Sequence, residues 1–319
     1  MNLTRVLLVG FGSMGRSHHR VITAHPTSSV VAIVEPGVIP PEFQVDIEAT
    51  QVFKSVEEAL NSQTYDAAVI ASSTSTHFEI ARRLIEMRLP TLIEKPFSAS
   101  QKEVDDLVEV ALREDVVIAC GLLERFNPAF LAAQKILKQP NFFMSIRHSP
   151  PAPRILSEVK GDLLIHDVDL ALRVLGEEVK ERFFVDTLDP NLSRSQAFPE
   201  TTSLVLKFDS HTQATLSASR LAQYKKRNLV IFDDEKTIDI DLLRRTISTH
   251  KNIYEDSISK GKGYVAGVVQ EFPEISEATE PLYAQWEWFV GQLDATSVTT
   301  WREELVHAQL VHWVVLADM

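Results

Sequence analysis

The first third of the chain alternates between short apolar, β-branched runs and longer segments whose apolar residues recur at helical spacing. This alternation is typical of βαβ units that carry a parallel sheet. The short runs predict strands at Arg5–Val9, Val30–Val34, Ala67–Ala71, Thr91–Glu94 and Val116–Cys120. The longer segments predict helices at Met14–His25, Ser55–Leu60, Thr76–Met87 and Ser100–Arg113. We therefore expect an α/β domain over residues 1–121, built as a Rossmann-type, doubly wound parallel sheet.

Beyond Asn127 the pattern changes, and strand candidates follow one another with little helix between them. These strands are expected at Phe142–His148, Val179–Thr187, Thr202–Phe208, Gln213–Ser219, Asn228–Phe232 and Thr237–Leu242. Helices are expected at Ala129–Leu137, Asp162–Leu175, Leu282–Leu293 and Arg302–Leu316, and the polar region Lys251–Glu280 is expected to be loop. Residues 122–319 are therefore predicted to form an α+β domain with an open, largely antiparallel sheet.

Composition and charge narrow the functional classes. The 319 residues fit roughly two domains at about 150 residues each. With 32 basic and 44 acidic side chains the formal net charge is −12, which argues against a general nucleic-acid binder. A local basic pocket for a small phosphorylated ligand remains compatible with this charge.

Cysteine usage and hydropathy point to a compartment. The only cysteine, Cys120, excludes an internal disulfide, and its apolar neighbours indicate a buried thiol. The apolar run Val6–Phe11 is too short for a signal peptide, and no stretch reaches the roughly 20 apolar residues of a membrane span. We expect a cytoplasmic protein.

A glycine-rich motif follows the first predicted strand and opens a helix, which is the setting of a dinucleotide-binding loop. Its glycines permit a tight turn, close approach of a pyrophosphate and close helix packing, while helix N-terminal amides face the phosphates. The alternative is a glycine-rich turn without a ligand. The candidate cofactor-binding residues are Gly10, Phe11, Gly12, Ser13, Met14 and Gly15.

Glu35 ends the second predicted strand, about 20 positions after this motif. An acidic side chain there accepts hydrogen bonds from the adenosine ribose hydroxyls, and it would repel a 2′-phosphate. No arginine follows in residues 36–39. The position therefore favours NAD over NADP, with a solvated strand-end carboxylate as the alternative.

Two later segments carry candidate catalytic groups. Glu94-Lys95-Pro96 ends a strand at the carboxyl edge of the predicted sheet, where such sheets bind ligands. At helical spacing, a second segment places on one face the side chains of Asp162, His166, Asp169 and Arg173. An aspartate four residues before a histidine can orient the imidazole as a proton acceptor. The alternative is an N-capping aspartate and an unrelated surface histidine.

Together these motifs resemble the glucose-fructose oxidoreductase / inositol dehydrogenase (Gfo/Idh/MocA) family. The resemblance covers nearly the whole chain and rests on GFGSMGRSH, Glu35, the Ser72–His77 segment, EKP, GLLERFNP and DLLIHDVD. It implies a Rossmann domain, an NAD cofactor, and a second domain whose open sheet forms a homodimer or homotetramer. It also implies that Lys95, Asp162 and His166 surround the sugar carbon that exchanges hydride with nicotinamide, and that Ser72, His77 and Glu94 contact the cofactor.

Within the family, the segments around Arg125, Asn127 and Arg147 most resemble nucleotide-sugar 3-dehydrogenases, so these residues and Asp169 are candidate substrate ligands. A diphosphate needs cationic partners, which Arg125, Arg147, His148, Arg154 and Lys160 could supply. Solvated surface charges are the alternative. No metal site is expected. The competing functions are an inositol or monosaccharide dehydrogenase and a non-catalytic, nucleotide-sensing regulator.

Overall fold

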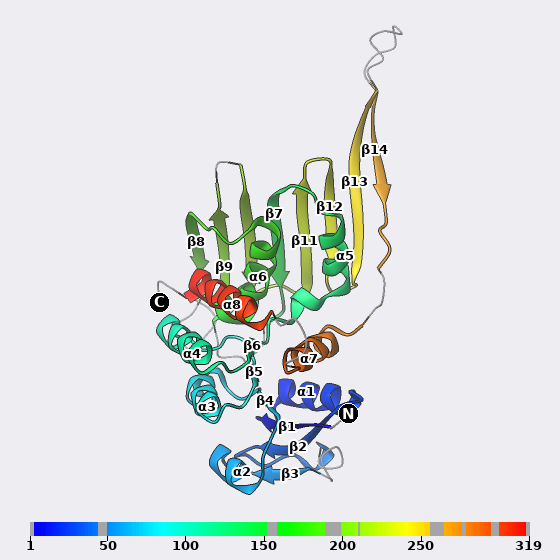
Figure 1. Cartoon of the computed structure of the whole chain (residues 1–319). Coiled ribbons are helices and arrows are strands. Elements are labelled where there is room, and N and C mark those ends of the chain that lie inside the picture. Colours follow the sequence, from blue (N-terminus) through cyan, green and yellow to red (C-terminus); the bar gives the residue numbers. More distant parts are fainter. Residues whose placement is uncertain are drawn as a thin grey trace. The chain divides into compact units, whose positions relative to one another are not determined.

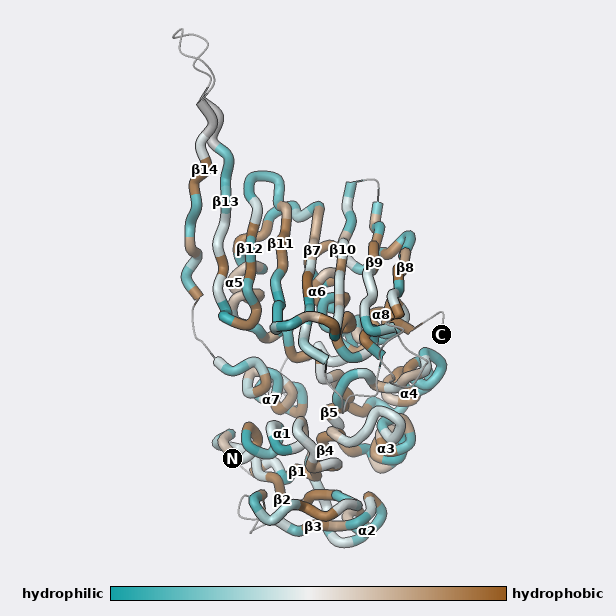
Figure 2. The backbone as a smooth tube through the Cα atoms, turned by 180° about the vertical axis from the view of Figure 1, so that it is seen from behind, coloured by the Kyte–Doolittle hydropathy of each residue, from teal (hydrophilic) through white to brown (hydrophobic). Residues whose placement is uncertain are grey.

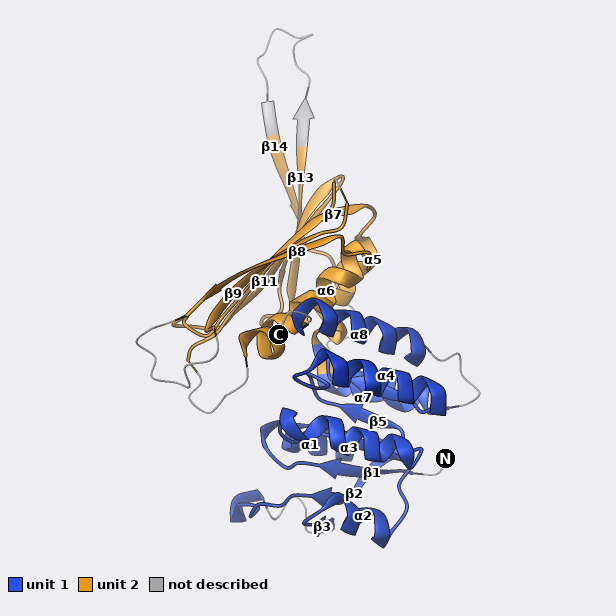
Figure 3. Ribbon diagram, turned by 90° about the vertical axis from the view of Figure 1, so that its left-hand side faces the viewer, with its two compact units in different colours: residues 1–123, 282–319 blue, residues 124–281 orange. Residues whose placement is uncertain are grey.

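The structure is a computed structural model, and it describes residues 3–43, 50–151, 158–188, 199–209, 211–255, 265–275, 279–294 and 300–316. The chain forms two compact units, coloured separately in Figure 3. Unit 1 comprises residues 1–123 and 282–319, and unit 2 comprises residues 124–281.

Unit 1 is built on a six-stranded sheet with the order β3-β2-β1-β4-β5-β6, and every neighbouring pair in it is parallel. This confirms the predicted Rossmann-type sheet. Figure 1 labels its strands, which are β1 (Thr4–Val9), β2 (Ser28–Val34), β3 (Gln51–Phe53), β4 (Ala67–Ile70), β5 (Thr91–Ile93) and β6 (Ile118–Cys120). The α-helices of this unit are α1 (Ser13–Ala24), α2 (Val56–Ser62), α3 (Thr74–Glu86), α4 (Gln101–Glu114), α7 (Pro281–Gln292) and α8 (Trp301–Leu316).

The last two helices differ from the expected division at residue 122, because they pack with unit 1. Trp286 and Phe289 of α7 are fully buried in one apolar cluster with the core of β1 and β2. The Trp286 indole also donates a hydrogen bond to Ser28 Oγ (3.1 Å). Burying an aromatic side chain of this size is a large favourable term, so the C-terminal segment completes the Rossmann core.

Unit 2 contains an eight-stranded sheet with the order β14-β13-β12-β11-β7-β10-β9-β8. Only β7 and β10 pair in parallel, which confirms a largely antiparallel sheet. The strands are β7 (Pro140–His148), β8 (Glu181–Thr187), β9 (Thr201–Lys207), β10 (Gln213–Ser219), β11 (Lys226–Asp233), β12 (Lys236–Asp241), β13 (Thr246–Glu255) and β14 (Val265–Glu271). The expectation of a loop over Lys251–Glu280 is wrong for residues 251–255 and 265–271, because Thr249–Glu255 of β13 pair with Val265–Glu271 of β14.

Two helices, α5 (Pro128–Ile136) and α6 (Ile165–Leu175), lie on one face of this sheet (Figure 3). Figure 2 shows hydrophobic and hydrophilic positions alternating along its strands. Alternate residues therefore face α5 and α6, where Phe143, Leu204 and Leu216 are buried. In the described part of the chain, no helix is long and apolar enough to cross a membrane.

Candidate active site

The glycine loop joins β1 to α1 and has the geometry that a dinucleotide requires. Gly10 has φ +93°, and a Cβ there would lie 2.7 Å from the Ala71 carbonyl oxygen. A Cβ on Gly15 would lie 2.1 Å from the Gly10 carbonyl oxygen. A Cβ on Gly12, in contrast, would meet nothing within 4 Å. The loop is thus packed tightly where it turns and open where a pyrophosphate would approach.

A cleft of about 500 Å³ runs along this loop and the ends of the neighbouring strands. Its lining includes Gly10, Gly12, Glu35, Ser72 and Thr76, all within unit 1. Ser13 and Met14 open α1, whose first turn contains no acidic residue. The helix N-terminus therefore presents no carboxylate that would repel a phosphate.

Glu35 lines the cleft where β2 ends, as the sequence predicts. One carboxylate oxygen accepts a hydrogen bond from the Phe11 N–H and the other from the Gly37 N–H, each at 2.9 Å. Sequence reasoning missed Lys54, whose ammonium donates to the carbonyls of residues 35–37 at 2.8–3.4 Å. This proximity arises from the fold, because the Glu35 N–H donates a hydrogen bond to the carbonyl of Phe53, the last residue of β3.

The Glu94-Lys95-Pro96 segment follows β5, and its glutamate is buried. Glu94 Oε1 lies 2.7 Å from His18 Nε2, and a Cβ on Gly121 would lie 2.9 Å from Glu94 Oε2. Burial alone would raise the pKa of Glu94, but the hydrogen bond from His18 and the charge of Lys95 hold it below its ordinary value. The residue before Lys95 is therefore tightly packed and negatively charged.

Two buried histidines support the Lys95 loop. The His77 ring lies between two carbonyl oxygens, with Nδ1 2.8 Å from that of Pro96 and Nε2 3.2 Å from that of Ser72. His312 of α8 accepts a hydrogen bond from the Phe97 N–H (2.9 Å) and stacks on the Phe97 ring. His77 thus connects the loops that follow β4 and β5.

In unit 2, the segment with Asp162 and His166 is not the single α-helix that the sequence predicts. A π-helical turn, η4 (Lys160–Leu164), comes first, and the Ile165 N–H donates to the carbonyl of Lys160. His166 lies in the first turn of α6 with 7% of its surface exposed. Asp162 accepts a hydrogen bond from Arg220 at 2.7 Å. Orientation of His166 by Asp162 stays a prediction, and π turns of this kind are frequent at functional sites.

The predicted substrate ligands form buried ion pairs around α6. Arg147 donates to Asp167 through two nitrogens (2.7 and 2.9 Å) and to Glu124 through the third (2.9 Å). Arg125 holds the Asp169 carboxylate with two hydrogen bonds, at 3.1 and 2.5 Å. Burial opposes ionisation of Glu124, but the charge of Arg147 keeps its pKa below the ordinary value.

These contacts argue against the hypothesis that Arg147 binds a diphosphate directly, because all three guanidinium nitrogens already donate to carboxylates. Asn127 also has an internal role: its Oδ1 accepts from the Ala129 N–H and caps α5, and its Nδ2 donates to Leu242 and Glu124. Sequence alone shows the positive charge of Arg125 and Arg147, but it does not show the carboxylates that they meet.

Lys160 and His148, two further candidate ligands for a diphosphate, also have partners within the protein. Lys160 pairs with Asp186 (2.8 Å), and His148 Nε2 lies 2.9 Å from Ser217 Oγ. Arg154 lies outside the described residues. Among the described residues, no group of three or more His, Cys, Asp or Glu side chains could hold a metal ion.

Comparison with known proteins agrees with this geometry. Residues 4–122 match the model of an oxidoreductase family with an NAD-binding Rossmann fold, and residues 151–239 match the GFO/IDH/MocA C-terminal domain. The UDP-N-acetylglucosamine 3-dehydrogenase of Acidithiobacillus ferrooxidans is 29% identical over 269 residues, covering 83% of this chain and 80% of that protein. A crystal structure of that enzyme covers 99% of both chains, with 25% identity and a TM-score of 0.80.

A second relative is the myo-inositol 2-dehydrogenase of Thermotoga maritima, which is 26% identical over 218 residues, covering 64% of this chain and 65% of that protein. The fold, the glycine loop and the two family matches thus agree across both units. The chain belongs to the GFO/IDH/MocA family of oxidoreductases with an NAD-binding Rossmann fold, and it is an enzyme of the dehydrogenase class.

Proposed function

We propose that this chain is an NAD-dependent dehydrogenase that oxidises C3 of a nucleotide-sugar. The observation that carries the proposal is the 29% identity with a UDP-N-acetylglucosamine 3-dehydrogenase over 269 residues. The residues that the family resemblance assigns to chemistry, Lys95, Asp162 and His166, are all present.

The cofactor half of the proposal rests on unit 1. Gly12 leaves open space beside the N-terminus of α1, and Glu35 presents a carboxylate at the end of β2. This arrangement suits an adenosine ribose with a free 2′-hydroxyl. We therefore assign NAD as the cofactor, held by the glycine loop, Glu35 and Ser72. When bound, it supplies the hydride acceptor.

His166 is the proposed general base, and it accepts the proton of the sugar hydroxyl at an imidazole nitrogen. Asp162 orients this imidazole. The ammonium of Lys95 stabilises the negative charge that develops on the sugar oxygen, or it accepts the proton in place of His166. Arg125 holds the helix that carries His166, because it forms a bidentate pair with Asp169 of α6.

A substrate panel tests the proposal. Purified protein is mixed with NAD and, in separate reactions, UDP-N-acetylglucosamine, myo-inositol and glucose, while the absorbance of reduced nicotinamide is followed. We expect reduction with the UDP-sugar and a lower kcat/KM with the other two. Efficient oxidation of myo-inositol alone supports the alternative that the Thermotoga relative suggests. A lack of reduction with all three favours the non-catalytic regulator.

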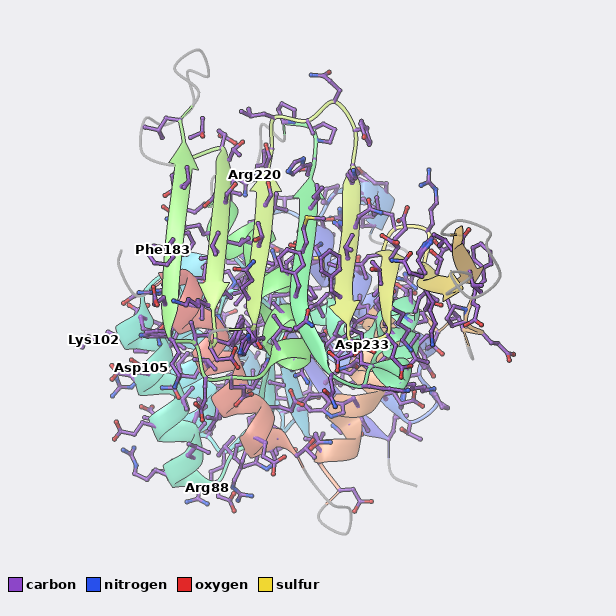
Figure 4. All side chains as sticks on the ribbon, turned by 90° about the horizontal axis from the view of Figure 1, so that it is seen from above. Arg88, Lys102, Asp105, Phe183, Arg220 and Asp233 are labelled. Carbon is purple, nitrogen blue, oxygen red and sulfur yellow. The ribbon has the colours of Figure 1, made fainter. Side chains whose placement is uncertain are left out.

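We further propose that the chain forms a homodimer or homotetramer through the sheet face of unit 2 that α5 and α6 do not cover (Figure 3). This face carries exposed apolar side chains, including Phe183 on β8 (55% exposed; Figure 4), Val185 (67%) and Phe232 (43%). Exposed apolar patches are typical of subunit interfaces. Light scattering should give a multiple of 35.9 kDa, and Phe183→Glu should lower it. A wild-type mass of one chain would contradict this proposal.

A further inference from the structure

A second cleft, of about 480 Å³, lies within unit 2 beside the first residues of β11 and the turn after β12. The lining combines an exposed aromatic ring with a strong excess of positive charge: Tyr224, Lys225, Lys226, Arg227, Arg244 and Asp241.

The single acidic side chain among these residues is already occupied. The Asp241 carboxylate accepts hydrogen bonds from the N–H groups of Leu243 and Arg244 and from the Arg244 guanidinium, at 2.9–3.0 Å. Among the described residues, no carboxylate pairs with Lys225 or Lys226. In a chain with a net charge of −12, this concentration of cations gives a local site that attracts anions.

Arg227 connects the cleft to the helix that carries His166. Its guanidinium lies 3.1 Å from Glu124 Oε1, which also pairs with Arg147 at 2.9 Å. Arg147 in turn holds Asp167 of α6. Burial and the positive charge of Arg147 lower the pKa of Arg227, so the protonated guanidinium would be stabilised by an additional anion.

The cleft also lies at the end of the sheet where the Asp162 segment is held. Lys226, at the start of β11, pairs with His148, which ends β7. His148 pairs on its other side with Ser219, which ends β10. Arg220 follows directly, at that end of the sheet in Figure 4, and it forms the ion pair with Asp162. Asp233, which ends β11, lies at the opposite end.

We propose that this cleft binds the nucleoside diphosphate part of a nucleotide-sugar, with Lys225, Lys226 and Arg227 on the phosphates and the Tyr224 ring against the base. Ammonium and guanidinium groups form charge-assisted hydrogen bonds with phosphate oxygens. Tyr224 is 67% exposed and offers a flat ring on which a base can stack. The inference rests on the nucleotide-sugar substrate of the proposed function and places its nucleotide on residues that sequence resemblance did not identify.

Calorimetric titration of the whole protein, saturated with NADH so that the glycine loop is filled, tests this site. The titrants are UDP, uridine, pyrophosphate and N-acetylglucosamine. We expect UDP to bind at least about tenfold more tightly than uridine, which corresponds to 1.4 kcal/mol. The double variant Lys225→Gln/Lys226→Gln should lose most of that difference. Tyr224→Ala should weaken UDP and uridine but leave pyrophosphate unchanged.

The matched control is Lys180→Gln, which removes an exposed lysine of the same unit that pairs with Glu178. It should bind UDP like the wild type, and NADH affinity should be the same in every variant. Equal affinity of the wild type for UDP and uridine would overturn the proposal, as would UDP affinity that is unchanged in the double variant.

Turnover measurements distinguish a failure of this inference from a failure of the proposed function. If UDP binds through the two lysines but no UDP-sugar reduces NAD, the cleft is a nucleotide-binding site and the proposed activity is wrong. If a UDP-sugar is oxidised and its KM is unchanged in the double variant, the activity stands and the cleft is not its binding site.

Discussion

His18 Nε2 lies 2.7 Å from Glu94 Oε1, and both side chains are buried, so the first helix and the segment before Lys95 are connected by a hydrogen bond in the interior of unit 1. His18 belongs to α1, four residues after Met14 of the glycine loop. One polar contact therefore stabilises both the helix that follows the glycine loop and the segment before Lys95. Sequence spacing gives no indication of it, because 76 positions separate the two residues.

Removing one partner of this contact should be costly. His18→Ala leaves the buried Glu94 carboxylate without its imidazole donor, and we expect the free energy of unfolding to fall by about 3 kcal/mol in urea titrations. The double variant His18→Leu/Glu94→Leu should be less destabilised than the sum of the single changes.

His25→Ala is the control for this cycle. His25, which caps the C-terminus of α1, is also buried, but its Nδ1 lies 3.0 Å from the Ser28 hydroxyl and, among the described residues, contacts no carboxylate. His25→Ala should lower the free energy of unfolding by about 1 kcal/mol. An equal loss of unfolding free energy in His18→Ala and His25→Ala would show that the contact with the Glu94 carboxylate adds no stability beyond that of a neutral hydrogen bond.

Cofactor choice should depend on Glu35. Its carboxylate lines the cleft beside the glycine loop, where a 2′-phosphate would meet a like charge. The wild type should bind NADH more tightly than NADPH in fluorescence titrations. Glu35→Gln should shift the affinity ratio toward NADPH by about tenfold, or 1.4 kcal/mol. The exposed Glu79→Gln should leave the ratio unchanged, and tighter NADPH binding by the wild type would contradict the assignment.

Lys95 and His166 should affect turnover more than cofactor binding. If they act on the reacting oxygen, Lys95→Ala and His166→Ala should each lower kcat by about 10²-fold or more. The dissociation constant of NADH should stay close to that of the wild type. Lys102→Ala, which removes an exposed lysine on α4, serves as the control. Wild-type kcat in either active-site variant would remove that residue from the mechanism.

The buried His312 should make stability depend on pH. Burial lowers its pKa from 6.5 to about 4, although a hydrogen bond to the Ala308 carbonyl partly opposes this shift. The unfolded state therefore takes up the proton first as pH falls. The contribution of the neutral His312 ring to folding stability is complete above pH 6.5 and is lost as the pH falls from 6.5 to 4.

Unfolding titrations across this range check the effect. Wild-type stability should fall through this window by about 3 kcal/mol more than that of His312→Gln. The exposed His211→Gln should follow the wild type. Parallel pH profiles for the wild type and His312→Gln would show that this histidine does not titrate as its burial implies.

Local patterns predict the cofactor loop well. The spacing from Gly10 to Gly15 and on to Glu35 is determined by one strand, one turn and one helix, and Gly10, Gly12 and Glu35 line one cleft. The α6 region is less predictable, because a π turn changes the geometry between Asp162 and His166 and no sequence period indicates it.

Long-range packing explains the other differences. β3 is only a three-residue strand, and β13 contains a polar run from Ser248 to Asn252 that carries no alternation. Trp286 completes the core around Ser28 across 258 positions, so its place in unit 1 is not evident from its neighbours. Arg147 is a plausible phosphate ligand by charge, but Asp167 and Glu124 surround its guanidinium in the fold.

Isotope transfer distinguishes a nucleotide-sugar 3-dehydrogenase from an inositol dehydrogenase. UDP-N-acetylglucosamine deuterated at C3 is incubated with the enzyme and NAD, and the nicotinamide product is analysed by NMR. We expect deuterium to appear at C4 of reduced nicotinamide and the sugar product to carry a carbonyl at C3. Deuterium retained in the sugar while deuterated myo-inositol transfers its label, or no transfer from either compound, would contradict the assignment as a nucleotide-sugar 3-dehydrogenase.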